Sequence, residues 1–91
     1  MEIREEQDRF ALYNDEKKEI GEMTWSVAGE KMIIIDHTFV DPEYRGQHLA
    51  EQLVAKGVEK ARREEKKIIP LCPFAKKEFD MKPEYGDVLR K

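Results

Sequence analysis

The segment from Val40 to Ala50, with the sequence VDPEYRGQHLA, constrains the fold more than any other part of this chain. It follows an apolar run, Met32–Val40, and leads into a charged amphipathic segment from about Gly46 to Glu64. A strand that turns through Pro, Arg and Gly into a helix presents free backbone N–H groups at the helix N-terminus, and these groups favour an anion, above all a phosphate. The sequence therefore predicts an anion-binding turn between a central strand and the main helix. Taken alone, Asp41-Pro42 has a simpler interpretation as an ordinary helix start.

Three segments have the patterns of antiparallel strands: Arg9–Tyr13, Ile20–Val27 and Met32–Val40. The second alternates clearly between apolar and polar residues, which is typical of a half-buried strand. The third begins apolar on both faces, which indicates a central strand covered on both sides. Residues 1–8 are polar, and they either fray or begin the first strand.

Polar residues interrupt the apolar run at Asp36-His37-Thr38, just before the predicted turn. Regular strand alternation places His37 on the face of Ile35 and Phe39, and Asp36 on the face of Thr38 and Val40. Only one of Asp36 and His37 is then expected to point at a given site.

The second half of the chain predicts a helix, a strand and short C-terminal helices. The helical stripe contains Leu49, Ala50, Leu53, Gly57, Val58 and Ala61. Gly57 costs about 1 kcal/mol in a helix interior, so close packing against the sheet is its expected reason. Lys67–Cys72 is predicted to be a strand at a sheet edge because of Pro70, and the strand–helix–strand unit implies a parallel pair. A short helix over Pro73–Met81 and a final turn or short helix over 84–89 follow.

The expected fold is therefore α+β, in the order β-β-β-α-β-α, as one domain over residues 1–91. Its 91 residues suffice for one small core, and a composition of 41% charged and 40% hydrophobic residues predicts a soluble globular chain. A net charge of −3 argues against general nucleic-acid binding. No apolar run is long enough to span a membrane, and the acidic start resembles no signal or transit peptide.

Cysteine usage narrows the site chemistry. The single cysteine, Cys72, allows no internal disulfide and no multi-cysteine zinc site, and no metal site is expected. A lone thiol fits a reducing compartment, so a cytoplasmic location is expected.

The run Arg45-Gly46-Gln47-His48-Leu49-Ala50 resembles the acetyl-CoA-binding motif of the GCN5-related N-acetyltransferases, Gln/Arg-x-x-Gly-x-Gly/Ala. Arg45 matches the first position and Ala50 the last, whereas His48 stands where the central Gly is usual. The very short members of the family are similar through Asp36-His37-Thr38, Pro70-Leu71-Cys72-Pro73-Phe74 and Pro83-Glu84-Tyr85. The resemblance implies a minimal family fold of three antiparallel strands, the main helix, a parallel strand and short C-terminal helices.

The resemblance also implies a cofactor site. Backbone N–H groups from Gly46 to Ala50, including those of Gln47, His48 and Leu49, are expected to hold the CoA pyrophosphate, while Arg45 adds charge. The backbone of Phe39 and Val40 is expected to pair with the pantetheine arm, and the Val40 N–H to polarise the thioester carbonyl. Pro70 fits a splay between the two strands, or is an ordinary edge proline.

Three residues are candidates for proton transfer. Cys72 is either a small buried hydrophobic residue or a general acid near the CoA sulfur, and less favourably a nucleophile. His37 is either a general base or a structural histidine that pairs with Asp36 or Thr38. Tyr85 is a further candidate acid, because a tyrosine often serves that role in the family.

The resulting hypothesis is an acetyl-CoA-dependent N-acyltransferase in which an amine, on a small molecule or a protein, attacks the thioester directly. Two alternatives belong to other classes: a non-catalytic CoA- or acyl-CoA-binding module, and a small protein-interaction domain without the cofactor. Because little chain lies outside the cofactor core, a homodimer or a partner protein is a possible source of the rest of the acceptor site. Nucleic acid and membrane are not expected partners.

Overall fold

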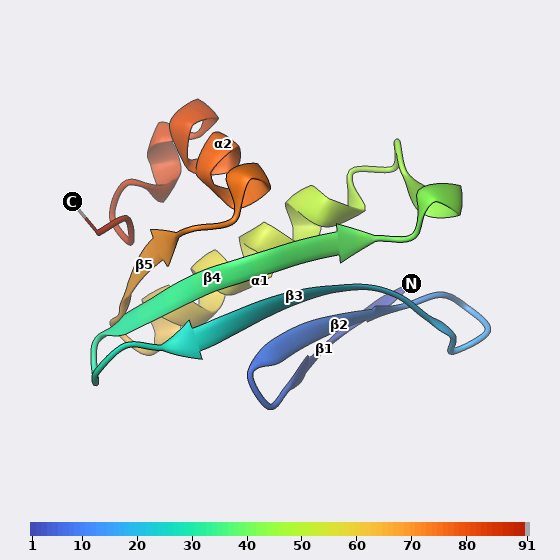
Figure 1. Ribbon diagram of the computed structural model, residues 1–91, viewed down its shortest axis with the longest axis horizontal. Coiled ribbons are helices and arrows are strands. Elements are labelled where there is room, and N and C mark those ends of the chain that lie inside the picture. Colours follow the sequence, from blue (N-terminus) through green and yellow to red (C-terminus); the bar gives the residue numbers. More distant parts are fainter. Residues whose placement is uncertain (91) are drawn as a thin grey trace.

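Five strands form one sheet in the order β1-β2-β3-β4-β5 in the computed structural model, which describes residues 1–90 (Figure 1). The strands are β1 (Glu2–Glu6), β2 (Arg9–Tyr13), β3 (Glu19–Val27), β4 (Met32–Val40) and β5 (Lys67–Pro70). The helices are α1 (Leu49–Arg63) and α2 (Pro73–Met81), with 3-10 turns η1 (Pro42–Tyr44) and η2 (Pro83–Tyr85). Of the helices described, none is long and apolar enough to cross a membrane.

The α+β class and the order of the predicted elements are confirmed. β2, β4 and α2 have the predicted bounds, β5 pairs parallel to β4, and β5 is the last strand of the sheet. The final segment forms η2 and then a single parallel bridge between Leu89 and Ile68.

The prediction of three antiparallel strands was incomplete, because β1 adds a fourth. Residues 2–6 pair antiparallel with β2, so the strand interpretation of the N-terminus is correct and fraying is not observed there. β1 is polar, and ion pairs with α1 help to hold it in place. The Glu5 carboxylate pairs with Lys60 at 2.7 Å and with Arg63 at 2.9 Å, and both cations belong to α1. Ion pairs between residues this far apart in the chain produce no hydrophobic periodicity, so the sequence pattern alone did not identify β1 as a strand.

α1 packs across one face of the sheet, and α2 packs beside α1 against β5 (Figure 1). The core between them contains Phe10, Leu12, Met23, Trp25, Ile35, Leu53, Val58 and Ile68, among others. Gly57 is buried there, and a β-carbon on it would lie 2.7 Å from the Met23 Cε. The predicted reason for this glycine, close packing against the sheet, is confirmed.

A β-bulge at Asp36 overturns the predicted alternation along β4. Thr24 of β3 pairs with His37 and Trp25 pairs with Ile35, so that Asp36 is the extra residue. A bulge shifts the side-chain period by one residue. Ile35 is therefore buried toward α1, whereas His37 is exposed on the opposite face.

Asp36 and His37 consequently point to the same face, contrary to the prediction. Asp36 accepts a hydrogen bond of 2.6 Å from Ser26 Oγ, and Ser26 shares a face of β3 with Thr24, the partner of His37. The predicted common face of His37 and Phe39 is confirmed by their stacked rings.

Candidate functional site

The turn after β4 begins with a capped 3-10 helix. The Asp41 carboxylate accepts a hydrogen bond of 2.9 Å from the Glu43 N–H, and Pro42 occupies the first turn of η1. Asp41-Pro42 is therefore a helix start, but the helix is η1. The predicted start of the main helix, near Gly46, was early, because Gly46 and His48 have φ values of 88° and 59° and α1 begins at Leu49.

The strands β4 and β5 separate before β4 ends. Their register stops at Ile35 and Pro70, and the N–H groups of Leu71 and Cys72 both donate to the Ile35 carbonyl as the chain turns into α2. β5 therefore leaves the last residues of β4 without a paired strand on that edge. The predicted splay at Pro70 is present.

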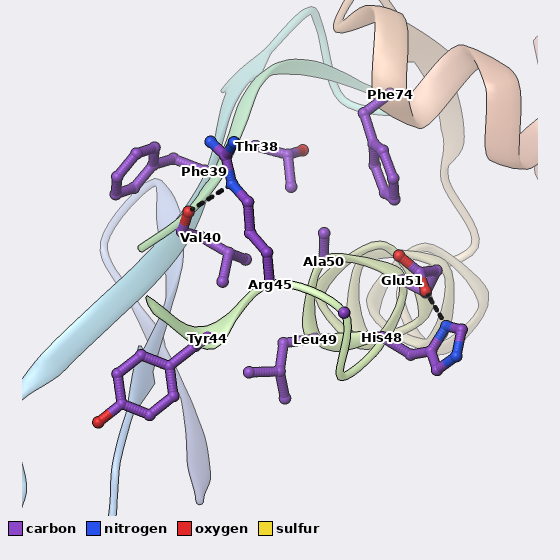
Figure 2. A pocket seen from close by; sticks show the side chains of 11 residues that line it. Thr38, Phe39, Val40, Tyr44, Arg45, His48, Leu49, Ala50, Glu51 and Phe74 are labelled. Atoms are coloured by element: carbon purple, nitrogen blue, oxygen red, sulfur yellow. Dashed lines mark hydrogen bonds and ion pairs between the residues drawn. The ribbon is translucent and has the colours of Figure 1, made fainter. Parts of the chain in front are cut away.

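Val40 directs its backbone groups to this free edge. The Asp41 N–H donates to the Ile20 carbonyl of β3 at 2.7 Å, so the N–H and C=O of Val40 point to the opposite edge of β4. In agreement, Arg45 Nε lies 3.4 Å from the Val40 oxygen on that side (Figure 2). A backbone donor and acceptor thus face the space that β5 leaves.

The N-terminus of α1 carries no side-chain cap. His48 occupies the cap position in the left-handed region, where His is tolerated better than most residues, and its ring does not cap the helix. Its Nδ1 lies 2.5 Å from Glu51 Oε2, and the ring points away from Val40 and Ala50 (Figure 2). The N–H groups at the start of α1 have no partner within the helix, so they and the helix dipole favour an anion.

The free edge of β4 and the start of α1 border one cleft of about 320 Å³, at the lower end of the range for ligand pockets (Figure 2). Seven of the eight residues predicted to bind the cofactor line it; Gln47 does not. They are Phe39, Val40, Arg45, Gly46, His48, Leu49 and Ala50. In Figure 2, Thr38 and Val40 project toward α1, whereas Phe39 projects to the other side of β4.

Cys72 lies at the N-cap of α2, next to the cleft. The thiol is buried, and its Sγ lies 3.5 Å from Oγ1 of the cleft residue Thr38. Burial opposes ionisation of the thiol, but hydrogen bonds from the Ala75 N–H, the Thr38 hydroxyl and the Phe74 N–H hold the pKa of Cys72 below its ordinary value. The sequence placed Cys72 before a helix; the contact with Thr38 is a tertiary feature.

The other two candidates for proton transfer lie elsewhere. His37 lies on the face of the sheet opposite Cys72, with its ring stacked 6.4 Å from that of Phe39. Tyr85 packs against Phe79, with the Lys82 ammonium 5.6 Å from its ring centre, and does not line the cleft. The structure thus brings Cys72, Thr38 and Val40 together and separates Tyr85 from them.

Sequence reasoning missed four residues that line the cleft: Thr38, Tyr44, Glu51 and Phe74. Phe74, in the first turn of α2, is half-buried and projects into the cleft (Figure 2). The sequence did contain one indication that Phe74 lines the site: it is a bulky residue directly after Cys72-Pro73, in the first turn of the predicted helix. Tyr44 is held by a hydrogen bond of 3.0 Å from Asn14, which no local pattern reveals. Within residues 1–90, no three His, Cys, Asp or Glu side chains are arranged to hold a metal ion.

Comparison with known proteins agrees with this architecture. A family model described as GCN5-related N-acetyl-transferase matches residues 9–88. A GCN5-like protein from Staphylococcus aureus, solved by NMR, is 35% identical, with a TM-score of 0.80 over 98% of this chain and 87% of that one. The Escherichia coli GNAT family N-acetyltransferase YhbS, solved in complex with CoA, is 29% identical, with a TM-score of 0.62 over 69% of this chain and 38% of that one.

A more distant structure shares the fold. N-acetylglutamate synthase from Neisseria gonorrhoeae, complexed with coenzyme A and N-acetyl-glutamate, is 20% identical, with a TM-score of 0.66 over 81% of this chain and 18% of that one. Among curated proteins, none matches the chain significantly. The family model and the S. aureus structure both cover most of the chain, which therefore belongs to the GCN5-related N-acetyltransferase family. The resemblance inferred from Arg45–Ala50 is confirmed.

Proposed function

We propose that this chain transfers an acetyl group from acetyl-CoA to an amine by direct attack of the amine nitrogen on the thioester. One observation carries the proposal: the free edge of β4 and the uncapped start of α1 border the same cleft. Family membership supports acyl transfer in general, and YhbS and the N-acetylglutamate synthase were solved with CoA.

The residues of the cleft fit a CoA molecule. The N–H groups from Gly46 to Ala50 and the Arg45 guanidinium suit a pyrophosphate. Gly46 has open space where a β-carbon would lie, so a phosphate can approach its backbone closely. The free edge of β4 suits the amide groups of a pantetheine arm, which pair with it as an added strand would.

When bound, acetyl-CoA supplies the thioester carbonyl that the amine attacks. The Val40 N–H donates to the carbonyl oxygen as negative charge develops there. His37 accepts a proton from the amine, directly or through water, and Cys72 delivers a proton to the departing sulfur. The amide C–N bond forms as the C–S bond breaks, so one proton leaves nitrogen and one reaches sulfur.

Thermal unfolding with and without acetyl-CoA tests the proposal. At a concentration of 100 times Kd, a ligand that binds only the folded state adds about 2.7 kcal/mol to the free energy of unfolding. For a chain of this size that raises Tm by roughly 10 °C or more. No rise at millimolar acetyl-CoA contradicts the proposal and favours a protein-interaction domain. A rise without thiol release in the presence of any amine of a test panel favours a non-catalytic CoA-binding module.

Variants separate the two proton-transfer roles. His37→Ala and Cys72→Ala are each expected to lower the rate of amine-dependent thiol release by about 10²-fold or more. The Tm rise with acetyl-CoA is the control, and it is expected to persist in His37→Ala because His37 does not line the cleft. Unchanged turnover in a variant removes that residue from the mechanism.

A further inference from the structure

The face of the sheet opposite α1 carries no helix in the part of the chain that the structure describes (Figure 1). Strand alternation and the Asp36 bulge determine which side chains it presents beside the proposed reaction centre. They are Glu22, Thr24 and Ser26 from β3 and Asp36, His37 and Phe39 from β4, and we call the whole surface the open face. Asp36, His37 and Phe39 are all exposed.

The open face is acidic. Over β1 to β4, five carboxylates and two guanidinium groups lie on it, which gives a formal charge of −3: Glu2, Glu6, Glu19, Glu22 and Asp36 against Arg4 and Arg9. The whole chain also has a formal charge of −3, so the charges on the remainder of the chain cancel. One cation serves three of these carboxylates, because Arg9 pairs with Glu6, Glu19 and Glu22 at 2.7 to 3.0 Å.

The acidic surface is continuous with the end of β4. Glu22 lies opposite Phe39 in the β3–β4 register, and Thr24 lies opposite His37. Phe39 also lines the cleft, so it belongs to both surfaces. Cys72 and Thr38 occupy the α1 side of β4, and α1 and α2 close that side. An amine therefore has access to the free edge of β4 from the open face, where His37 lies.

We propose that the open face binds a lysine-rich protein segment and presents one lysine amine to the free edge of β4; this inference rests on the proposed acetyl transfer. Glu22 and Asp36 attract ammonium groups to either side of the His37–Phe39 stack, by charge complementarity. The two exposed rings pack the alkyl stem of a lysine and attract its charged end.

The shape of the surface favours a protein segment over a small amine. Small ligands bind in concave pockets that bury most of their surface, whereas Asp36, His37 and Phe39 lie exposed on a sheet. A chain that crosses β1 to β4 meets several carboxylates at once, and each exposed pair adds only a little. Many weak contacts along one segment compensate for the lack of enclosure.

Peptide binding tests the inference without turnover. The probes are two fluorescent, N-terminally capped ten-residue peptides, one with five lysines and one with a single lysine and glutamine elsewhere. We expect the lysine-rich peptide to bind at least tenfold more tightly at 50 mM salt and to lose that advantage at 1 M salt, where charges are screened within about 3 Å. We also expect it to shift the backbone amide signals of β3 and β4 residues in NMR spectra, and not those of the exposed side of α1.

Matched variants locate the binding surface. Glu22→Gln with Asp36→Asn is expected to weaken binding of the lysine-rich peptide about five- to tenfold. The control, Glu59→Gln with Glu84→Gln, removes the same charge from exposed positions in α1 and η2 and is expected to change binding less than twofold. Three results overturn the inference. The first is equal binding of both peptides, and the second is an equal effect of both double variants. The third is displacement of the lysine-rich peptide by spermidine at an equal concentration of amine groups.

The Tm measurement with acetyl-CoA shows whether a negative peptide result refutes only the lysine-rich acceptor or the proposed acetyl transfer as well. The Tm rise with acetyl-CoA is expected in wild type and in both double variants, because none of their substituted residues lines the cleft. A rise together with equal binding of both peptides overturns only the lysine-rich acceptor. Selective peptide binding without any rise overturns acetyl transfer, and with it the acceptor role of the open face.

Discussion

Gly21 in β3 provides the most direct test of the geometry at the end of β4. A β-carbon at Gly21 would lie 2.7 Å from the Phe39 carbonyl oxygen, 3.3 Å from Leu12 Cδ2 and 3.4 Å from the Val40 Cα. The Phe39 and Val40 atoms belong to the backbone of the β3–β4 ladder, so they cannot move without disturbing the pairing. We predict that Gly21→Ala pushes the end of β4 away from β3 and displaces the Val40 N–H.

Gly57 in α1 offers a matched comparison, because the atom that its β-carbon would meet is different. That β-carbon would also approach another atom to 2.7 Å, but the atom is Met23 Cε, the end of a flexible side chain. Overpacking against fixed atoms typically costs 1–3 kcal/mol, so we expect Gly21→Ala to lose about 2 kcal/mol. Gly57→Ala gains about 1 kcal/mol of helix propensity, which offsets much of its packing cost, and a net change within about 1 kcal/mol is expected.

Urea and thermal unfolding, followed by the fluorescence of the single tryptophan, Trp25, measure both effects. A loss of about 2 kcal/mol corresponds to a fall in Tm of roughly 10 °C for a domain of this size. The stabilisation by acetyl-CoA is expected to fall in Gly21→Ala and to persist in Gly57→Ala, because only the first disturbs the β4 edge. A Gly21→Ala variant within about 0.5 kcal/mol of wild type would refute the close approach of β3 to Phe39.

Two further variants test local features. His48→Gly removes the penalty on a β-carbon at positive φ, whereas His48→Ala keeps it. In urea unfolding, His48→Gly is therefore expected to be about 1 kcal/mol more stable than His48→Ala. A glycine variant less stable than the alanine variant would contradict the left-handed conformation of residue 48. Hydrogen bonds from Lys60 and Lys66 lower the pKa of Glu64 to about 2, so its stabilising contribution is present above the unfolded pKa of about 4.3 and is lost as the pH falls through about 2. Glu64→Gln is expected to cost at most about 1 kcal/mol at pH 6, given solvent screening, and almost nothing at pH 2; a cost that stays constant on acidification would exclude this linkage.

Much of the fold could be predicted because its elements have strong local signals. The period of two in Ile20–Val27 and the helical stripe from Leu49 to Ala61 each identify one buried face. Pro73 marked the start of α2 correctly, and Pro70 marked the end of β4–β5 pairing. Each of these signals depends on residues that are neighbours in sequence.

The features that sequence reasoning missed depend on residues that are distant in sequence. β1 is stabilised by the pairing of Glu5 with Lys60 and Arg63, and the bulge at Asp36 exists only through its register with β3. The bulge separated His37 from the buried face of Ile35 and left it with Asp36 on the open face. A one-residue shift of this kind changes every later side chain, and no periodicity within β4 reveals it.

Some features of the candidate site likewise follow from local sequence, whereas others depend on the tertiary structure. The sequence by itself determined the family and the turn from Arg45 to Ala50, because backbone N–H groups at a helix start require only a local run of residues. Only the tertiary structure decided that β4 has no strand partner on its outer edge at Val40, that Cys72 lies beside Thr38, and that the His48 ring pairs with Glu51. These contacts follow from strand pairing and packing, in which each position depends on the whole fold.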